Sequence, residues 1–143
     1  MILRELKLKE RKMDIELEKK LFKSYPKLFP KGRSVNPKES LICFGIECGD
    51  GWFDLINKLC HCIQKYLDDN DMVQVVVVQV KEKFGGLRFY AHNTDTLIDG
   101  MIWFVEHNSF NVCELCGEQG VLRDNHNWYK TLCEECYKKW KKK

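Results

Sequence analysis

Several features that define other classes of protein are absent from this sequence. No apolar run approaches the length of a membrane span, and the first twenty residues, MILRELKLKERKMDIELEKK, lack the apolar core and cleavage site of a signal peptide. The motifs Gly-x-Ser-x-Gly, the P-loop and His-Glu-x-x-His do not occur. We therefore expect a cytoplasmic protein without membrane association and, lacking any known catalytic spacing, without enzymatic activity.

Proline is scarce and confined to one segment. The chain has three prolines, Pro26, Pro30 and Pro37, and all lie in SYPKLFPKGRSVNPKES, which predicts an extended loop. The remainder is 44% hydrophobic and 12% aromatic over 143 residues, enough to bury a core. This length suits one domain with a small appendage.

Charge of either sign is unevenly distributed. Residues 1–33 carry eleven Lys/Arg against five Asp/Glu, and residues 34–72 carry three against seven. The last stretch, 111–143, is basic again. Basic ends are compatible with nucleic acid or an acidic protein partner, and equally with solvated helix faces and a frayed lysine tail.

Apolar periodicity predicts three helices. Residues 1–24 form a basic amphipathic pattern, and a second helix follows GDGW, with Asp50 as its N-cap and an end near Asp68. The third lies in TDTLIDGMIWFVEHNS, where Thr96 and Asp99 suggest a capping box. The apolar positions are Leu3, Leu6, Met13, Leu17 and Leu21, then Phe53, Ile56, Cys60, Ile63 and Leu67, then Ile98, Met101, Ile102 and Val105.

A valine-rich run predicts the centre of a sheet. Val73–Val80 is nearly continuous in β-branched residues, which is typical of a strand buried on both faces. Gly85-Gly86 then predicts a turn, and Leu87–Ala91 the returning strand of a hairpin. Leu41–Phe44 is a candidate for a further short strand.

The cysteines carry the strongest chemical signal. Cys113-x2-Cys116 and Cys133-x2-Cys136 are separated by sixteen residues, a spacing typical of a zinc site. Four thiolates would complete a tetrahedral shell and leave no position for an activated water, so we expect one structural zinc. VLR and WYKTL between the pairs predict the two strands of a zinc ribbon. His126 is a weaker competing ligand.

The other cysteines form a less convincing set. A second zinc held by Cys43, Cys48, Cys60, Cys62 or His61 is an alternative to buried, unligated thiols. Cys60 and Cys62 point about 200° apart on a helix, which is poor geometry for one ion.

Two groups of residues are candidates for binding. Cations and rings gather on or beside the hairpin, and a mixture of this kind suits phosphates and stacked bases as well as an ordinary solvated surface. They are Lys81, Lys83, Arg88, Tyr90 and His92. In IECGDGW, Glu47, Asp50 and Trp52 together with Arg88 suggest a small-ligand or catalytic pocket, although Asp50 is explained equally well as a helix cap.

The motifs ECGDGWFDLI, VKEKFGGLRFY and CELCG…TLCEEC resemble those of a group of small uncharacterised proteins of bacteria, prophages and phages. The resemblance covers most of the chain from about Tyr25 onward. It implies a zinc-containing domain and a phage or mobile-element context, and it supplies no mechanism.

The sequence as a whole predicts an α+β fold, with helices packed on a small antiparallel sheet around the hairpin. We expect an N-terminal helix over 1–24, an α+β core over 25–110 and a zinc ribbon with a basic tail over 111–143. The expected function is non-enzymatic binding of nucleic acid or a host macromolecule. Alternatives are a phage inhibitor that binds a host defence or regulatory protein, and a small-ligand-binding protein or enzyme. The oligomeric state is not indicated.

Overall fold

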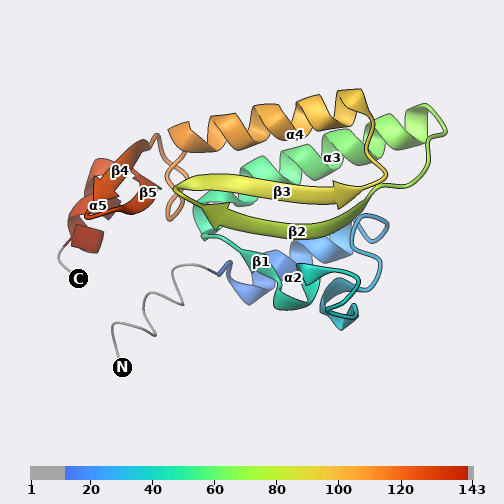
Figure 1. Cartoon of the computed structure of the whole chain (residues 1–143), viewed down its shortest axis with the longest axis horizontal. Coiled ribbons are helices and arrows are strands. Elements are labelled where there is room, and N and C mark those ends of the chain that lie inside the picture. Colours follow the sequence, from blue (N-terminus) through green and yellow to red (C-terminus); the bar gives the residue numbers. More distant parts are fainter. Residues whose placement is uncertain (1–11, 142–143) are drawn as a thin grey trace.

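Helices and a three-stranded sheet share the main hydrophobic core of the protein (Figure 1). The structure is a computed structural model that describes residues 12–141. Its helices α2 (Ile15–Ser24), α3 (Phe53–Asp69) and α4 (Thr96–Asn108) contribute to this core, and β2 and β3 cross in front of α3 in the figure. The α+β prediction is confirmed. The predicted helix over 1–24 is observed from Ile15, and residues 1–11 lie outside the described part of the chain.

The sheet is built on the predicted hairpin. Strands β2 (Val76–Lys83) and β3 (Gly86–His92) pair antiparallel, and β1 (Ile46–Glu47) adds to β2 in parallel, giving the order β1-β2-β3. The predicted antiparallel hairpin is confirmed, and the sheet also gains one short parallel strand that the sequence did not predict. β1 is only two residues long, and a strand this short has no periodicity of its own to reveal it.

The two faces of the sheet differ, and the expectation of a strand buried on both faces is wrong. Val77 and Val80 are both buried although they are three residues apart, because the register shifts between Val77 and Gln79. The extra residue of this β-bulge moves the next side chain back to the core face. Val76 and Val78 are half-buried, and Val73 lies outside the strand with 73% of its surface exposed.

Helix α3 presents the predicted apolar face to the core but begins differently. Ile56, Cys60, Ile63 and Leu67 are buried. Asp50 is not the N-cap, because a short 3-10 helix, Asp50–Trp52, precedes α3.

The cap of α4 lies one residue earlier than predicted. The Asp95 carboxylate accepts a hydrogen bond from the Ile98 N–H at 2.8 Å, and the predicted capping box of Thr96 and Asp99 is wrong. Ile98 and Ile102 are buried, as the apolar pattern predicts.

The proline-containing segment forms turns and short 3-10 helices along the edge of the sheet. Leu41–Phe44 is a 3-10 helix instead of the expected strand, because the Ser40 hydroxyl caps it by accepting from the Ile42 N–H. Ser40 also donates to the Val78 carbonyl at 3.1 Å, which attaches the segment to β2 at the bulge.

A second, smaller unit lies at one end of the molecule (Figure 1). It consists of the hairpin β4 (Val121–Asn125) and β5 (Trp128–Leu132), as predicted, followed by α5 (Glu134–Lys141). Its own core contains Cys113, Leu132 and Trp140. The lysines of α5 suggest a frayed tail in the sequence, yet Trp140 anchors this helix in the small core.

Among the described residues, no helix combines the length and apolar character that crossing a bilayer requires.

Candidate functional site

The four C-terminal cysteines converge into a group that could hold a metal ion. Cys113 and Cys116 precede β4, Cys133 directly follows β5, and Cys136 lies in the first turn of α5. All four sulfur atoms are within 4.8 Å of one another, and the Sγ atoms of Cys116 and Cys133 are 3.6 Å apart. A tetrahedral ion with metal–sulfur bonds of about 2.3 Å separates its ligands by about 3.8 Å, so the group has the right size.

Each Cys-x2-Cys pair forms a tight turn, here called a knuckle, and the backbone holds both the first knuckle (Cys113–Cys116) and the second (Cys133–Cys136). The Gly117 N–H donates to the Cys113 carbonyl at 2.9 Å and closes the first turn, in which Gly117 has a φ of +82°. In the second, the Cys136 N–H donates to the Cys133 sulfur at 3.4 Å. This bond favours the thiolate and is the main reason the pKa of Cys133 is lowered, whereas burial raises the pKa of Cys116 and Cys136.

No other group of metal-ligating side chains occurs within residues 12–141, which disfavours the second zinc site. Cys48 and Cys60 are fully buried in the main core, where burial raises the pKa of each thiol well above its ordinary value. His126 is exposed in the β4–β5 turn with a φ of +52° and does not join the four-cysteine group.

The GDGW motif holds the first knuckle against the main core. The indole N–H of Trp52 donates to the Val112 carbonyl at 2.8 Å, and the Gly51 N–H donates to the Glu114 carbonyl at 2.8 Å. The Gly49 N–H donates to the carboxylate of Glu114 at 3.0 Å. Backbone and side chains of this motif thus bind both ends of the chain segment that carries Cys113.

The Gly85-Gly86 motif forms a second attachment, between the turn of the β2–β3 hairpin and the C-terminal unit. The Thr131 hydroxyl of β5 donates to the Gly85 carbonyl at 2.7 Å. A Cβ at Gly86 would stand 2.4 Å from the ring of Phe110, so only glycine lets this ring approach. The turn itself uses Phe84 and Gly85, with φ of +53° and +85°, instead of the predicted glycine pair.

A buried ion pair lies beneath the first knuckle and was missed by sequence reasoning. Glu114 and Lys130 are almost fully buried, their Oε1 and Nζ atoms are 3.5 Å apart, and neither atom has a hydrogen-bond partner in the described structure. Burial raises the pKa of Glu114, and the opposing effect of Lys130 is smaller. A glutamate next to a cysteine gives no sequence signal of burial, because charged residues are normally exposed.

The structure does not bring the residues of the expected ligand pocket together. Trp52 is 0% exposed, and its polar atom is already bonded. The Asp50 carboxylate accepts from the Asp14 N–H at 2.7 Å and so fixes the start of α2. Glu47 and Arg88 lie on β1 and β3, on either side of Lys81 in the register.

The candidate binding residues of the hairpin do share one face of the sheet. Glu47, Lys81 and Arg88 form one cross-strand row, and Gln79 and Tyr90 form the next. The alternate row of Ile46, Val80 and Phe89 points into the core. We call the outer side the open face, defined by Glu47, Lys81, Lys83, Arg88, Tyr90 and His92.

The open face is accessible and positively charged. Its side chains are half-buried or exposed, and Figure 1 shows no helix in front of β2 and β3. Within residues 12–141, none of its three cations forms a salt bridge, although Lys83 lies 5.8 Å from the ring of Phe84. Its cations therefore remain available for an anionic partner.

No family model, curated protein or solved structure matches the chain in comparisons with known proteins.

Proposed function

We propose that the four cysteines bind one structural zinc ion. Four thiolates with this spacing are the ligand set that zinc prefers in closed, tetrahedral sites. The two knuckles are joined by the Glu114 N–H, which donates to the Thr131 carbonyl at 2.9 Å, so the ion would lock an arrangement that the backbone already favours. Its role would be to stabilise the hairpin and α5.

On this scaffold, the protein acts as a non-enzymatic nucleic-acid-binding protein that uses the open face. The observation that carries this proposal is the group of three cations that form no salt bridge within residues 12–141, beside an exposed tyrosine on a sheet face that no described helix covers. Lys81 and Arg88 would contact phosphates, and Tyr90 would stack on a base. Single strands fit best, because their bases are accessible to rings on a flat sheet. A phage or mobile-element setting, which the sequence resemblance implies, is part of this proposal.

The small-ligand and enzyme alternatives lose their main support in this arrangement. Trp52, Asp50 and the glycines beside them are explained by their contacts with the first knuckle and with α2.

The proposal is tested by the salt dependence of oligonucleotide binding. We expect a fluorescent oligothymidylate to bind, with affinity falling steeply between about 50 and 200 mM salt. Replacing both cations in Lys81→Gln/Arg88→Gln should reduce the slope of log K against log salt by about 1.4, since each phosphate contact on a single strand contributes about 0.7.

The matched control removes two lysines from helices. Lys19→Gln/Lys65→Gln has the same change in net charge, and both lysines lie in exposed intrahelical pairs. Equal slopes for the two double variants, or no binding by the unmodified protein at low salt, would exclude the open face as a nucleic-acid site.

A partner protein is the second candidate, favoured by the apolar outer surface of α4. Leu97, Trp103 and Phe104 are 53%, 60% and 65% exposed, and a groove of about 510 Å³ runs between α3 and α4. Exposed apolar surface of this kind marks protein interfaces. This candidate predicts binding that is almost insensitive to salt, unaffected by the open-face variant and lost in Phe104→Ser.

A further inference from the structure

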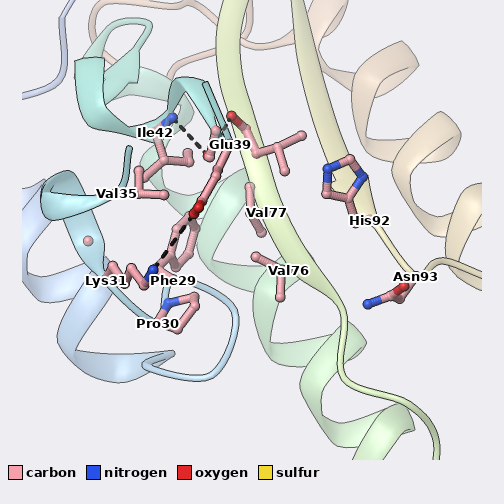
Figure 2. Close-up of a pocket in the computed structure, with 13 residues that line it drawn as sticks. Phe29, Pro30, Lys31, Val35, Glu39, Ile42, Val76, Val77, His92 and Asn93 are labelled. Carbon is pink, nitrogen blue, oxygen red and sulfur yellow. Dashed lines mark hydrogen bonds and ion pairs between the residues drawn. The ribbon is translucent and has the colours of Figure 1, made fainter. Parts of the chain in front are cut away.

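A pocket opens beside β2, and His92 of the open face forms part of its lining (Figure 2). Its volume is about 300 Å³, the lower end of the range for small-molecule sites. Figure 2 shows His92 and Asn93 on one side, Pro30 and Lys31 on the other, and Val76 and Val77 between them. Val76 pairs with His92 in the hairpin register, so the pocket continues the rows that contain Lys81, Arg88 and Tyr90.

The β-bulge and the proline-containing segment create the pocket. A regular strand directs consecutive side chains to opposite faces, but here Val76, Val77 and Val78 all line one hollow. The bulge lies at this point of β2, and β-bulges commonly occur beside binding sites. The opposite wall is held by the Val77 N–H, which donates to the Leu28 carbonyl, and by Ser40, which donates to Val78.

The walls are apolar and the rim is polar. Phe29, 3% exposed, and Ile42 form part of the lining, and partly buried Val35 packs against the same core. At the rim, the ion pair of Lys31 and Glu39 spans 3.7 Å.

The β3 side of the rim carries a ring and an amide. His92 is exposed, and the side-chain N–H of Asn93 donates to the Gln74 carbonyl at 3.1 Å, which fixes the amide. Asn93 has a φ of +66°, a conformation that asparagine tolerates better than most residues. The amide and the imidazole can therefore address the polar edge of a ring whose faces lie between apolar walls.

We propose that this pocket binds one unstacked nucleobase of a single-stranded nucleic acid that lies along the open face. This inference rests on the proposed function and adds a specific subsite to it. Arg88, Tyr90 and His92 are successive outward residues of β3, about 6.6 Å apart. A nucleic acid whose phosphate contacts Arg88 and whose base stacks on Tyr90 would therefore place its next base at the pocket.

Other occupants fit the pocket less well. Among the described residues that line the pocket, an isolated anion would find one lysine, Lys31, whose charge is already paired with Glu39. A metal ion would find one imidazole in the pocket, and the group of metal-ligating side chains found among the described residues, the four cysteines, does not line it. A flat heteroaromatic ring matches both the apolar walls and the polar rim.

The experiment compares strands with and without bases. The probes are an oligothymidylate and an abasic strand with the same number of phosphates. We expect the unmodified protein to prefer the strand with bases by about tenfold, as is typical of base–ring stacking. Filling the pocket with Val35→Trp should reduce this preference at least about threefold and leave binding of the abasic strand unchanged.

Two further variants make the result specific. Val73→Trp places the same side chain at an exposed position that does not line the pocket, and it should behave as the unmodified protein. His92→Ala alters only the exposed rim, so it tests the pocket even if Val35→Trp fails to fold. We expect it to lower the preference for the strand with bases over the abasic strand by about threefold.

The outcomes separate the two proposals. If the unmodified protein binds the strands but Val35→Trp and His92→Ala keep the full preference for bases, the pocket is not the base site and the open face stands. If the unmodified protein binds neither strand at low salt, the nucleic-acid function and the base pocket are both wrong.

Discussion

Single residues in the most distinctive motifs serve contacts between distant parts of the chain. At Gly51, a Cβ would stand 2.1 Å from the Cys113 carbonyl oxygen and 2.6 Å from the Gly117 nitrogen. At Gly49, it would stand 2.4 Å from the Glu114 carbonyl oxygen. Glycine is required here because two stretches of backbone touch, so GDGW is explained without a ligand.

We expect Gly51→Ala to destabilise the protein by about 3 kcal/mol, because the added methyl group meets backbone that cannot move aside. Urea unfolding followed by circular dichroism measures this change. Gly100→Ala is the control: among the described residues, no atom beyond the chain neighbours and helix backbone of Gly100 lies within 4 Å of the added Cβ, and alanine favours a helix. It should stabilise the protein by about 0.5–1 kcal/mol. Similar unfolding midpoints for the two variants would contradict the close contact at Gly51.

At the scale of elements, the start of α4 shows how a helix boundary depends on tertiary contacts. Asp95 accepts from the Ile98 N–H and, at 2.8 Å, from the hydroxyl of Tyr66 on α3. Thr96 and Asp99 fit a capping pattern in sequence, but only Asp95 is positioned to bond both the helix and its neighbour. These two hydrogen bonds stabilise the ionised carboxylate and lower the pKa of Asp95.

This lowered pKa predicts a pH dependence of stability. A carboxylate with a lower pKa in the folded state stabilises the fold above its unfolded pKa, and the contribution is lost as pH falls through the folded pKa. We therefore expect Asp95→Asn to be less stable than the unmodified protein at neutral pH. The difference in urea midpoint should shrink as pH falls below about 4.

Comparing the two proteins at each pH cancels effects that both share, including loss of metal in acid. Asp99→Asn removes the same charge from the same helix without these two hydrogen bonds, and it should show a smaller change with pH. A difference for Asp95→Asn that is the same at neutral and acid pH would show that the charge of Asp95 does not support the cap.

The whole molecule contains two cores of very different size. The main core joins α2, α3, α4 and the sheet, whereas the C-terminal core has only Cys113, Leu132 and Trp140 as buried hydrophobic members among the described residues. So small a core needs an additional source of stability, and the proposed metal ion, held by four thiolates, would supply it.

We expect Cys113→Ser to lose the metal and unfold residues from about 112 onward, while the helices and sheet of the main core remain folded. Native mass spectrometry should show the loss of one zinc, and limited proteolysis should cut selectively in the C-terminal unit. Cys62→Ser is the matched control, since Cys62 is exposed and outside the four-cysteine group. A metal-free Cys113→Ser protein with the full native structure would contradict the proposed role of the ion.

Local patterns in the sequence determined much of this protein. The apolar stripes of α3 and α4 and the two hairpins follow from side-chain periodicity and turn residues, which act over a few neighbours. The four-cysteine group was also predictable, because each C-x2-C pair forms its own knuckle. The alternation of side chains along a strand likewise determined that Arg88, Tyr90 and His92 share one face of β3.

Tertiary structure decided the rest. The two-residue strand β1 exists only because β2 lies beside it, and Asp50 bonds to Asp14 instead of capping α3. The glycine motifs contact residues of the C-terminal unit, and the bulge that opens the pocket depends on the partner strand. These features are contacts between residues far apart in the chain, and a single sequence contains no local signal for them because folding alone brings the partners together.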